Sequence, residues 1–191
     1  GDLAAASRHA DRGAAAYDIA RHGSIALAYG DDPGVRCLGL GAWAKWGLGY
    51  AEQATTTDAA ALELAGELGI PQCEVQALFF SCWLYLMARD IRTATRTLDT
   101  LEALATRLGF AQFQSESTAM RGCLLVQQRE DCVAACECLE RGLAELASTG
   151  VHLKESWFMA SLAEAQAARG QAARARDVID ERHHVGVLHP C

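Results

Sequence analysis

A repeat of about 40 residues constrains the fold of this chain more than any other feature of its sequence. Leu-Gly or Thr-Gly pairs place glycines at 69, 109 and 150, at intervals of about 40 residues. Glycine suits the left-handed backbone position just past a helix end. A second series of turns with the same interval is predicted at Gly49, Arg89, Arg129 and Gly170. Two helices per period predict a stack of helix-turn-helix units, each packed on its neighbours.

Small residues follow the same period on both sides of the inner turns. Seven residues before each turn stand Ala42, Cys82, Gly122 and Ala163. Five residues after each turn stand Ala54, Ala94, Ala134 and Ala175. Antiparallel helices joined by a tight turn can approach closely only where small residues meet. We therefore expect both sets to be buried at helix crossings.

The pattern predicts helices over most of the chain. The expected ranges are Leu3–Asp18, Val35–Leu48, Ala51–Leu68, Gln72–Ala88, Arg92–Leu108, Gln112–Gln128, Cys132–Ser148, Leu153–Arg169 and Ala172–Arg182. Residues Arg21 to Pro33, rich in Gly and Asp, are expected to form a loop. β-Branched residues never alternate over a run, so no strand is predicted. The expected fold class is all-α, with residues 1–191 forming one repeat domain.

Composition argues against several classes of function. The net charge is −7 and no basic cluster is present, so nucleic acid is not an expected partner. The longest apolar stretch, Val75 to Ala88, is too short to cross a bilayer, so no membrane association is expected. The lysines, Lys45 and Lys154, lie in no phosphate-binding loop, and no catalytic motif is recognisable. We therefore expect no enzyme activity, no catalytic residues and no cofactor.

The cysteines raise the question of disulfides or metal. Disulfide scaffolds are short and loop-rich, whereas this chain reads as long helices, so its eight cysteines are expected to be reduced in a cytoplasm. Cys132 and Cys136 share a helix face, with Cys138 nearby, and could hold a metal. A second group that could hold zinc or nickel comprises His183, His184, His189 and Cys191. In both cases packing or an irregular chain end is the preferred interpretation, so no metal site is predicted.

The small–turn–Ala spacing resembles the tetratricopeptide repeat, most clearly at Ala163, Gly170 and Ala175. The resemblance implies antiparallel helical pairs stacked into a right-handed superhelix, a tetratricopeptide-like solenoid. Two departures are the longer repeat, of about 40 residues, and the arginines at turns 89 and 129.

Several segments also resemble the C-terminal repeat arrays of large bacterial signalling ATPases, which often carry a cyclase or helix-turn-helix domain. They are residues 29–35 (YGDDPGV), 48–50 (LGY), 77–80 (ALFF) and 143–150 (LAELASTG). The resemblance implies a regulatory or sensory part, with an ATPase or cyclase domain elsewhere in the parent chain. Because the chain opens at Gly1 without Met, we expect it to be a piece of a longer protein.

The tetratricopeptide resemblance implies a concave groove lined by the first helix of each pair. It places Trp43, Trp46, Phe79 and Trp83 in the groove, with Arg36 and Gln76 at its edge to hold a polar group. Trp and Arg dominate many binding surfaces. The alternative is that the rings are simply core, as aromatic residues at helical spacing often are.

Two main functions remain open from the sequence, and a purely structural dimerisation module is a weaker third. The first is a non-catalytic scaffold that binds a protein or peptide within a bacterial signalling protein. The second is a small-molecule sensor whose ligand lies in the aromatic groove. An open trough would favour the peptide, and an enclosed pocket ringed by the four aromatic residues would favour the small ligand.

Overall fold

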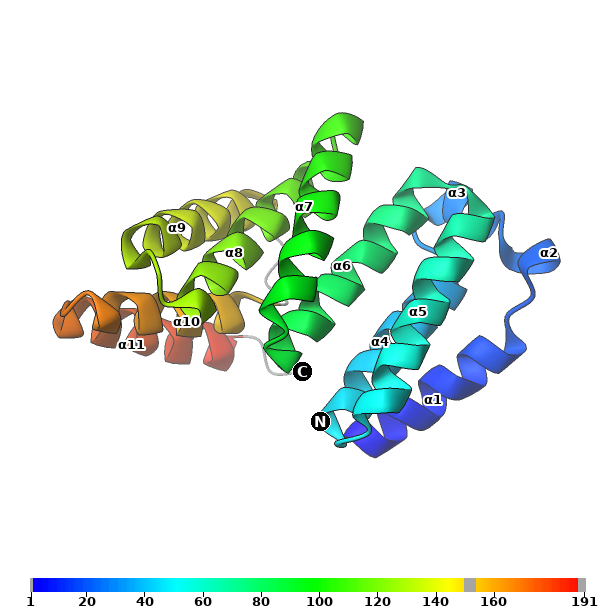
Figure 1. The fold of residues 1–191 in the computed structure, drawn as a ribbon, viewed down its shortest axis with the longest axis horizontal. Helices are drawn as coiled ribbons and strands as arrows, with labels where there is room; N and C mark the ends of the chain where they lie inside the picture. Colours follow the sequence, from blue (N-terminus) through cyan, green and yellow to red (C-terminus); the bar gives the residue numbers. More distant parts are fainter. Residues whose placement is uncertain (1, 150–153, 189–191) are drawn as a thin grey trace. The chain divides into compact units, whose positions relative to one another are not determined.

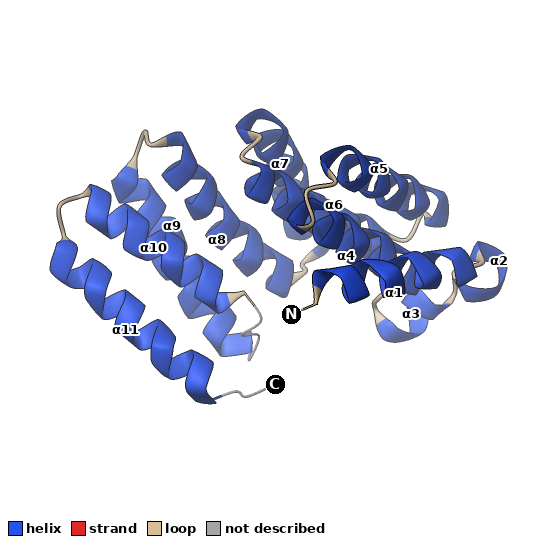
Figure 2. Cartoon of the chain, turned by 90° about the horizontal axis from the view of Figure 1, so that it is seen from below, coloured by secondary structure: helices blue, strands red, loops and turns tan. Residues whose placement is uncertain are grey.

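The computed structural model of the protein describes residues 2–149 and 154–188, with side chains for residues 2–148 and 154–180. Within these ranges the chain is helical and contains no strand (Figure 1, Figure 2). The helices are α1 (Leu3–Ala16), α2 (Ile19–His22), α3 (Ile25–Tyr29), α4 (Pro33–Gly47), α5 (Ala51–Leu68), α6 (Pro71–Ala88), α7 (Ile91–Leu108), α8 (Ala111–Gln128), α9 (Cys132–Thr149), α10 (Glu155–Ala168) and α11 (Ala172–Leu188). The all-α prediction is confirmed for this part of the chain.

The turns between helices adopt the left-handed backbone that the repeat predicts. Positive φ occurs at Gly49, Gly69, Gly109 and Gly170. Arg89 and Arg129 adopt it too, with φ of 55° and 59°, although side chains make this conformation unfavourable. The predicted turn at Gly150 lies outside the described residues.

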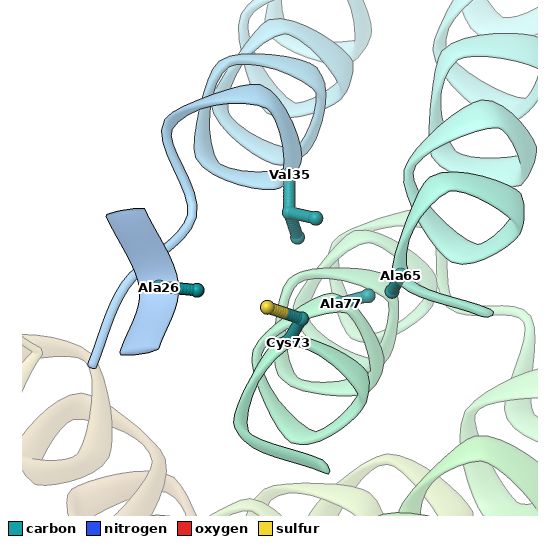
Figure 3. Packing of buried hydrophobic residues seen from close by; sticks show 5 residues of the cluster. All are labelled: Ala26, Val35, Ala65, Cys73 and Ala77. Atoms are coloured by element: carbon teal, nitrogen blue, oxygen red, sulfur yellow. The ribbon is translucent and has the colours of Figure 1, made fainter. Parts of the chain in front are cut away.

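The chain divides into two compact units, Gly1–Leu104 and Ala105–Cys191. In the first unit α4 is central and contacts α1, α5 and α6. Leu3 lies against Gly47 and Cys37 against Gly13, so α1 and α4 run antiparallel. A buried cluster at the start of α4 brings α3, α4, α5 and α6 together through Ala26, Val35, Ala65, Cys73 and Ala77 (Figure 3).

Glycines let the other helices approach α4 closely. A Cβ atom at Gly47 would lie 2.8 Å from Leu3 Cδ1, and one at Gly34 would lie 2.8 Å from the Tyr17 ring. A Cβ atom at Gly39 would overlap the Phe80 ring. Because α4 contacts helices on several sides, its glycines set how closely α1 and α6 approach it.

In the second unit α10 contacts α8, α9 and α11, and α8 pairs closely with α9 (Figure 2). A Cβ atom at Gly122 would lie 2.5 Å from Leu139 Cγ, and one at Gly142 would lie 2.7 Å from Ala119. Phe158 of α10 is fully buried. The contacts between consecutive helices are compatible with a helical repeat array.

The small residues before the turns are buried as predicted, at Ala42, Cys82, Gly122 and Ala163. After the turns, Ala54, Ala94 and Ala175 are buried, but Ala134 is only half-buried and Ala135 takes its place. The prediction for Ala134 is therefore wrong by one residue. The buried alanine is in every case the fourth residue of its helix, and three residues separate α8 from α9 where two separate α6 from α7.

The predicted loop from Arg21 to Pro33 is also corrected. It contains α3 and part of α2, with Asp18 capping α2 through a hydrogen bond from the Ala20 N–H. The other long helices match their expected ranges to within a few residues. The single domain over residues 1–191 stays a prediction. No helix in the described part is long and apolar enough to cross a membrane.

Candidate functional site

Three of the four predicted groove aromatics lie together. Trp43 packs on Phe79 and Trp83 with ring centroids 6.3 Å apart in each case, and on Phe80 at 4.9 Å. The indole Nε1 of Trp43 donates a hydrogen bond of 2.8 Å to the Phe80 carbonyl oxygen. Phe79 and Trp83 are 5% and 4% exposed, whereas Trp43 is half-buried. Trp43 is thus the member of this cluster best placed to meet a ligand.

Trp46 belongs to an adjoining cluster, which it shares with Trp43. It is half-buried and packs with Trp43 around Ala42, Ala54 and Leu84, where α4, α5 and α6 meet. Of the four aromatics, Trp43 is the one that lines the apolar groove described below.

The structure joins the two predicted edge residues, Arg36 and Gln76, through one acidic side chain. Arg36 forms an ion pair with Asp31, and the Gln76 amide donates a hydrogen bond to the same carboxylate. Gln76 is buried, and its Oε1 accepts the Asp32 N–H at 3.3 Å. Gln76 therefore has a structural role in anchoring the start of α4 to α6.

Asp32 explains why α4 begins where it does. Its carboxylate accepts the Val35 N–H at 2.9 Å and caps the helix, with Pro33 as the first helical residue. The Tyr17 hydroxyl donates to the same carboxylate at 2.9 Å. Burial, aided by Asp32, raises the pKa of Tyr17 far above its ordinary value.

An apolar groove between α1 and α4 is a ligand-like feature of the first unit. We call it the α1–α4 groove, and its lining is Leu3, Ala6, His9, Ala10, Cys37, Leu40, Trp43, Ala44, Gly47 and Met87. Its volume is about 640 Å³. Leu3 and Leu40 are 44% and 42% exposed, so apolar surface on both walls is open to water. Such concave apolar surfaces are typical of binding sites.

Small side chains keep the α1–α4 groove open. Ala6 and Ala10 on α1 and Ala44 and Gly47 on α4 occupy positions where larger residues would fill the space. From Cys37 to Gly47 the α4 wall covers ten residue steps, about 15 Å at the helical rise. The sequence predicted Trp43 as a lining residue but not the α1 wall, because α1 lies outside the repeat period.

The polar groups on α1 are arranged differently on its two sides. On one side Lys45 Nζ lies 2.5 Å from Asp11 Oδ1 in an ion pair that joins α4 to α1. On the other side the Arg12 guanidinium Nη2 lies 2.7 Å from His9 Nδ1. His9 lines the groove, so the Arg12–His9 pair marks a polar place on its border.

A second pocket, of about 420 Å³, lies in the other unit at the turn between α8 and α9. Its lining is Val126, Arg129, Cys132, Glu164, Ala165 and Ala168. Arg129 and Glu164 carry opposite charges and both are exposed. The mixed charges favour no single ligand class, and the α1–α4 groove remains the stronger candidate.

Two buried carboxylates lie away from both pockets. Burial raises the pKa of Asp58 to about 6, and hydrogen bonds from Ser81 and Tyr85 oppose part of that change. Burial also raises the pKa of Glu116, which the Lys154 ammonium opposes from 3.4 Å. Both groups sit between helices and bear on stability.

The cysteines of the described part are free thiols. Cys136 is buried and Cys132 and Cys138 are half-buried, as expected for one core and two edge residues. No group of three possible metal ligands occurs among residues with described side chains. The side chains of His183, His184, His189 and Cys191 lie outside the described residues.

Neither the models of known protein families nor the curated proteins compared with this chain give a match.

Proposed function

We propose that the chain is a non-catalytic regulatory or sensory module that binds a protein or peptide partner in the α1–α4 groove. The observation that carries the proposal is the groove itself: an apolar, water-exposed concavity of about 640 Å³. Apolar helices or peptides commonly bind in grooves of this kind, with apolar anchors every three or four residues.

The helical pairs support a tetratricopeptide-like solenoid as the scaffold. The second helix of each pair, α5, α7, α9 and α11, begins with the same geometry. Its fourth residue is a buried alanine, and the alanine N–H donates a hydrogen bond of 2.8 to 3.1 Å to the carbonyl oxygen of the residue before the helix. A recurring junction of this kind favours a repeat array.

The parent chain is proposed to be a bacterial signalling ATPase, with a linked ATPase or cyclase domain and a cytoplasmic location. The segments quoted above for the resemblance support this part of the proposal. Sequencing the reading frame around the chain tests it directly. A frame without a nucleotide-binding or cyclase domain would contradict the parentage and leave the groove proposal standing.

Peptide selection tests the binding function. Random 12-residue peptides displayed on phage are selected on the native chain and then tested on the Ala6→Phe variant. Ala6 is exposed and lines the groove, so phenylalanine should fill the groove without displacing packed atoms. Ala4→Phe is the matched control, because Ala4 is exposed on α1 outside the lining. We expect binders that Ala6→Phe rejects and Ala4→Phe retains; a selection without such binders would refute the proposed function.

A small-molecule sensor is the second candidate. The groove volume lies within the range of about 300–1,000 Å³ that is usual for ligand pockets. A neutral apolar dye, N-phenyl-1-naphthylamine, would report this function by a fluorescence increase that Ala6→Phe removes. If the dye binds in this way and no peptide does, the sensor is the better assignment.

A further inference from the structure

The two ends of the α1–α4 groove differ in chemistry. At one end Leu3, Gly47 and Met87 supply only apolar surface. At the other end Cys37 of α4 lies opposite Gly13 of α1, since a Cβ atom on Gly13 would be 2.5 Å from the cysteine Sγ. Because α1 and α4 run antiparallel, the adjoining arginines Arg12 and Arg36 lie on either side of this contact, about 3 Å apart along the helix axes. The groove has an apolar body and an arginine on each wall near this end.

The hydrogen bonds at this end leave donors facing outward. An arginine guanidinium can only donate, so His9 Nδ1 must accept the hydrogen bond from Arg12. The ring then carries its hydrogen on Nε2 and offers a second donor beside the groove. A ligand group bound here must be a hydrogen-bond acceptor.

Nearby carboxylates are already engaged. Asp11 pairs with Lys45, and Asp31 pairs with Arg36 and accepts from Gln76. Arg12 is exposed and, among the residues that the structure describes, makes no ion pair. Its guanidinium is thus the cation at the groove that lacks an acidic partner.

We propose, building on the proposed function, that the groove binds an amphipathic helix of a partner protein that carries an acidic side chain beyond its apolar anchors. The apolar face lies between Leu3 and Leu40, and the carboxylate accepts hydrogen bonds from Arg12 and His9. Ten residues of a helical partner cover about 15 Å, which matches the length of the α4 wall. Charge complementarity fixes the direction of the bound helix, because the reversed helix would place its acid against Leu3 and Met87.

The peptides selected on the native chain test this assignment. Those that Ala6→Phe rejects should share apolar residues at helical spacing followed by Asp or Glu. For one such peptide, Arg12→Glu should weaken binding about tenfold, because a charge-assisted contact becomes a repulsion. Arg21→Glu is the control with the same change in net charge, at an exposed residue outside the groove lining. It should leave the dissociation constant within about twofold of the native value.

A charge swap completes the test. Replacing the acidic residue of the peptide by Lys should weaken binding to the native chain and restore it toward Arg12→Glu, as measured by fluorescence anisotropy. Groove-dependent peptides without an acidic residue, or binding indifferent to Arg12→Glu, would overturn this inference while the proposed function stands. Recovery of no groove-dependent peptide would overturn both.

Discussion

The ionisation of Asp58 affects the stability of the folded state. Its side chain is 2% exposed, between α5 and α6, and the Ser81 hydroxyl donates to it at 2.8 Å. Burial raises its pKa from the ordinary 3.8 to about 6. The folded state therefore holds this proton more tightly than the unfolded state. The resulting stability is fully present below about pH 4 and is lost as the pH rises through about 6.

Asp58→Asn should remove this dependence. A difference of about two pKa units corresponds to about 3 kcal/mol, so the native chain should lose roughly that much from this group between pH 4 and pH 7. Over that interval the unfolding free energy of the variant should therefore rise relative to that of the native chain. Urea unfolding at several pH values measures it. Asp177→Asn, at an exposed aspartate, is the control; a pH-independent difference for Asp58→Asn would contradict the expectation.

Arg89 occupies a backbone conformation that favours glycine. With φ at 55°, the arginine Cβ crowds its own backbone at the end of α6. Arg89→Gly should raise the unfolding free energy by about 0.5–1 kcal/mol. Arg96→Gly, in the middle of α7 and exposed, should lower it by about 1 kcal/mol. Equal effects in denaturant unfolding would show that the turn at residue 89 is not strained.

At the scale of elements, the α8–α9 pair depends on the absence of a side chain at Gly122. A Cβ atom there would meet Leu139 Cγ at 2.5 Å and the Ala135 carbonyl oxygen at 3.0 Å. Gly122→Ala should therefore cost about 1–3 kcal/mol, although alanine favours helices. Gly66→Ala is the matched control, because nothing lies within 4 Å of its Cβ position in α5. It should stabilise by about 0.5–1 kcal/mol, and the same sign for both variants would exclude the crossing as the cause.

The repeat predicted the long helices and their turns because its signals are local: glycine at helix ends and small residues at crossings. Register within the third pair depended on loop length, which the spacing did not reveal, so Ala134 was predicted where Ala135 is buried. The short helices α2 and α3 were missed because the glycines and aspartates among residues 18–32 indicated a loop, yet Asp18 caps a helix there.

The binding groove was harder to predict than the helices. The aromatic spacing predicted Trp43 as a groove residue, and Trp43 lines the α1–α4 groove. The burial of Phe79 and Trp83 depends on how α6 packs against Gly39 and Trp43. The α1 wall carries no repeat signal and became visible only through its contacts with α4. Arg36 lies beside Asp31, and the unpaired cation on the border is Arg12, which the sequence pattern does not distinguish from other exposed arginines.

At the scale of the whole molecule, each of the two units has its own core. Trp83 belongs to the first and Phe158 to the second, and both are buried. In repeat proteins stability is the sum of local terms, so a core change should act mainly on its own unit. Trp83→Ala should cost about 3–5 kcal/mol and raise amide hydrogen exchange chiefly in residues 2–104. Phe158→Ala should raise amide hydrogen exchange chiefly in the residues beyond 104. Equal loss of protection in both units, measured by mass spectrometry, would indicate a single cooperative unit.

The glycines of α4 have a consequence for how this chain can vary. Any substitution of a glycine introduces a side chain, and at Gly34, Gly39 and Gly47 a Cβ atom has no room. Most such changes would press α4 against Tyr17, Phe80 or Leu3. Saturation mutagenesis should find α4 far less tolerant of exchange than α5, whose exposed face has Thr55, Thr56 and Gly66. Divergent relatives would then be recognised by the spacing of their glycines, even where the apolar residues have changed.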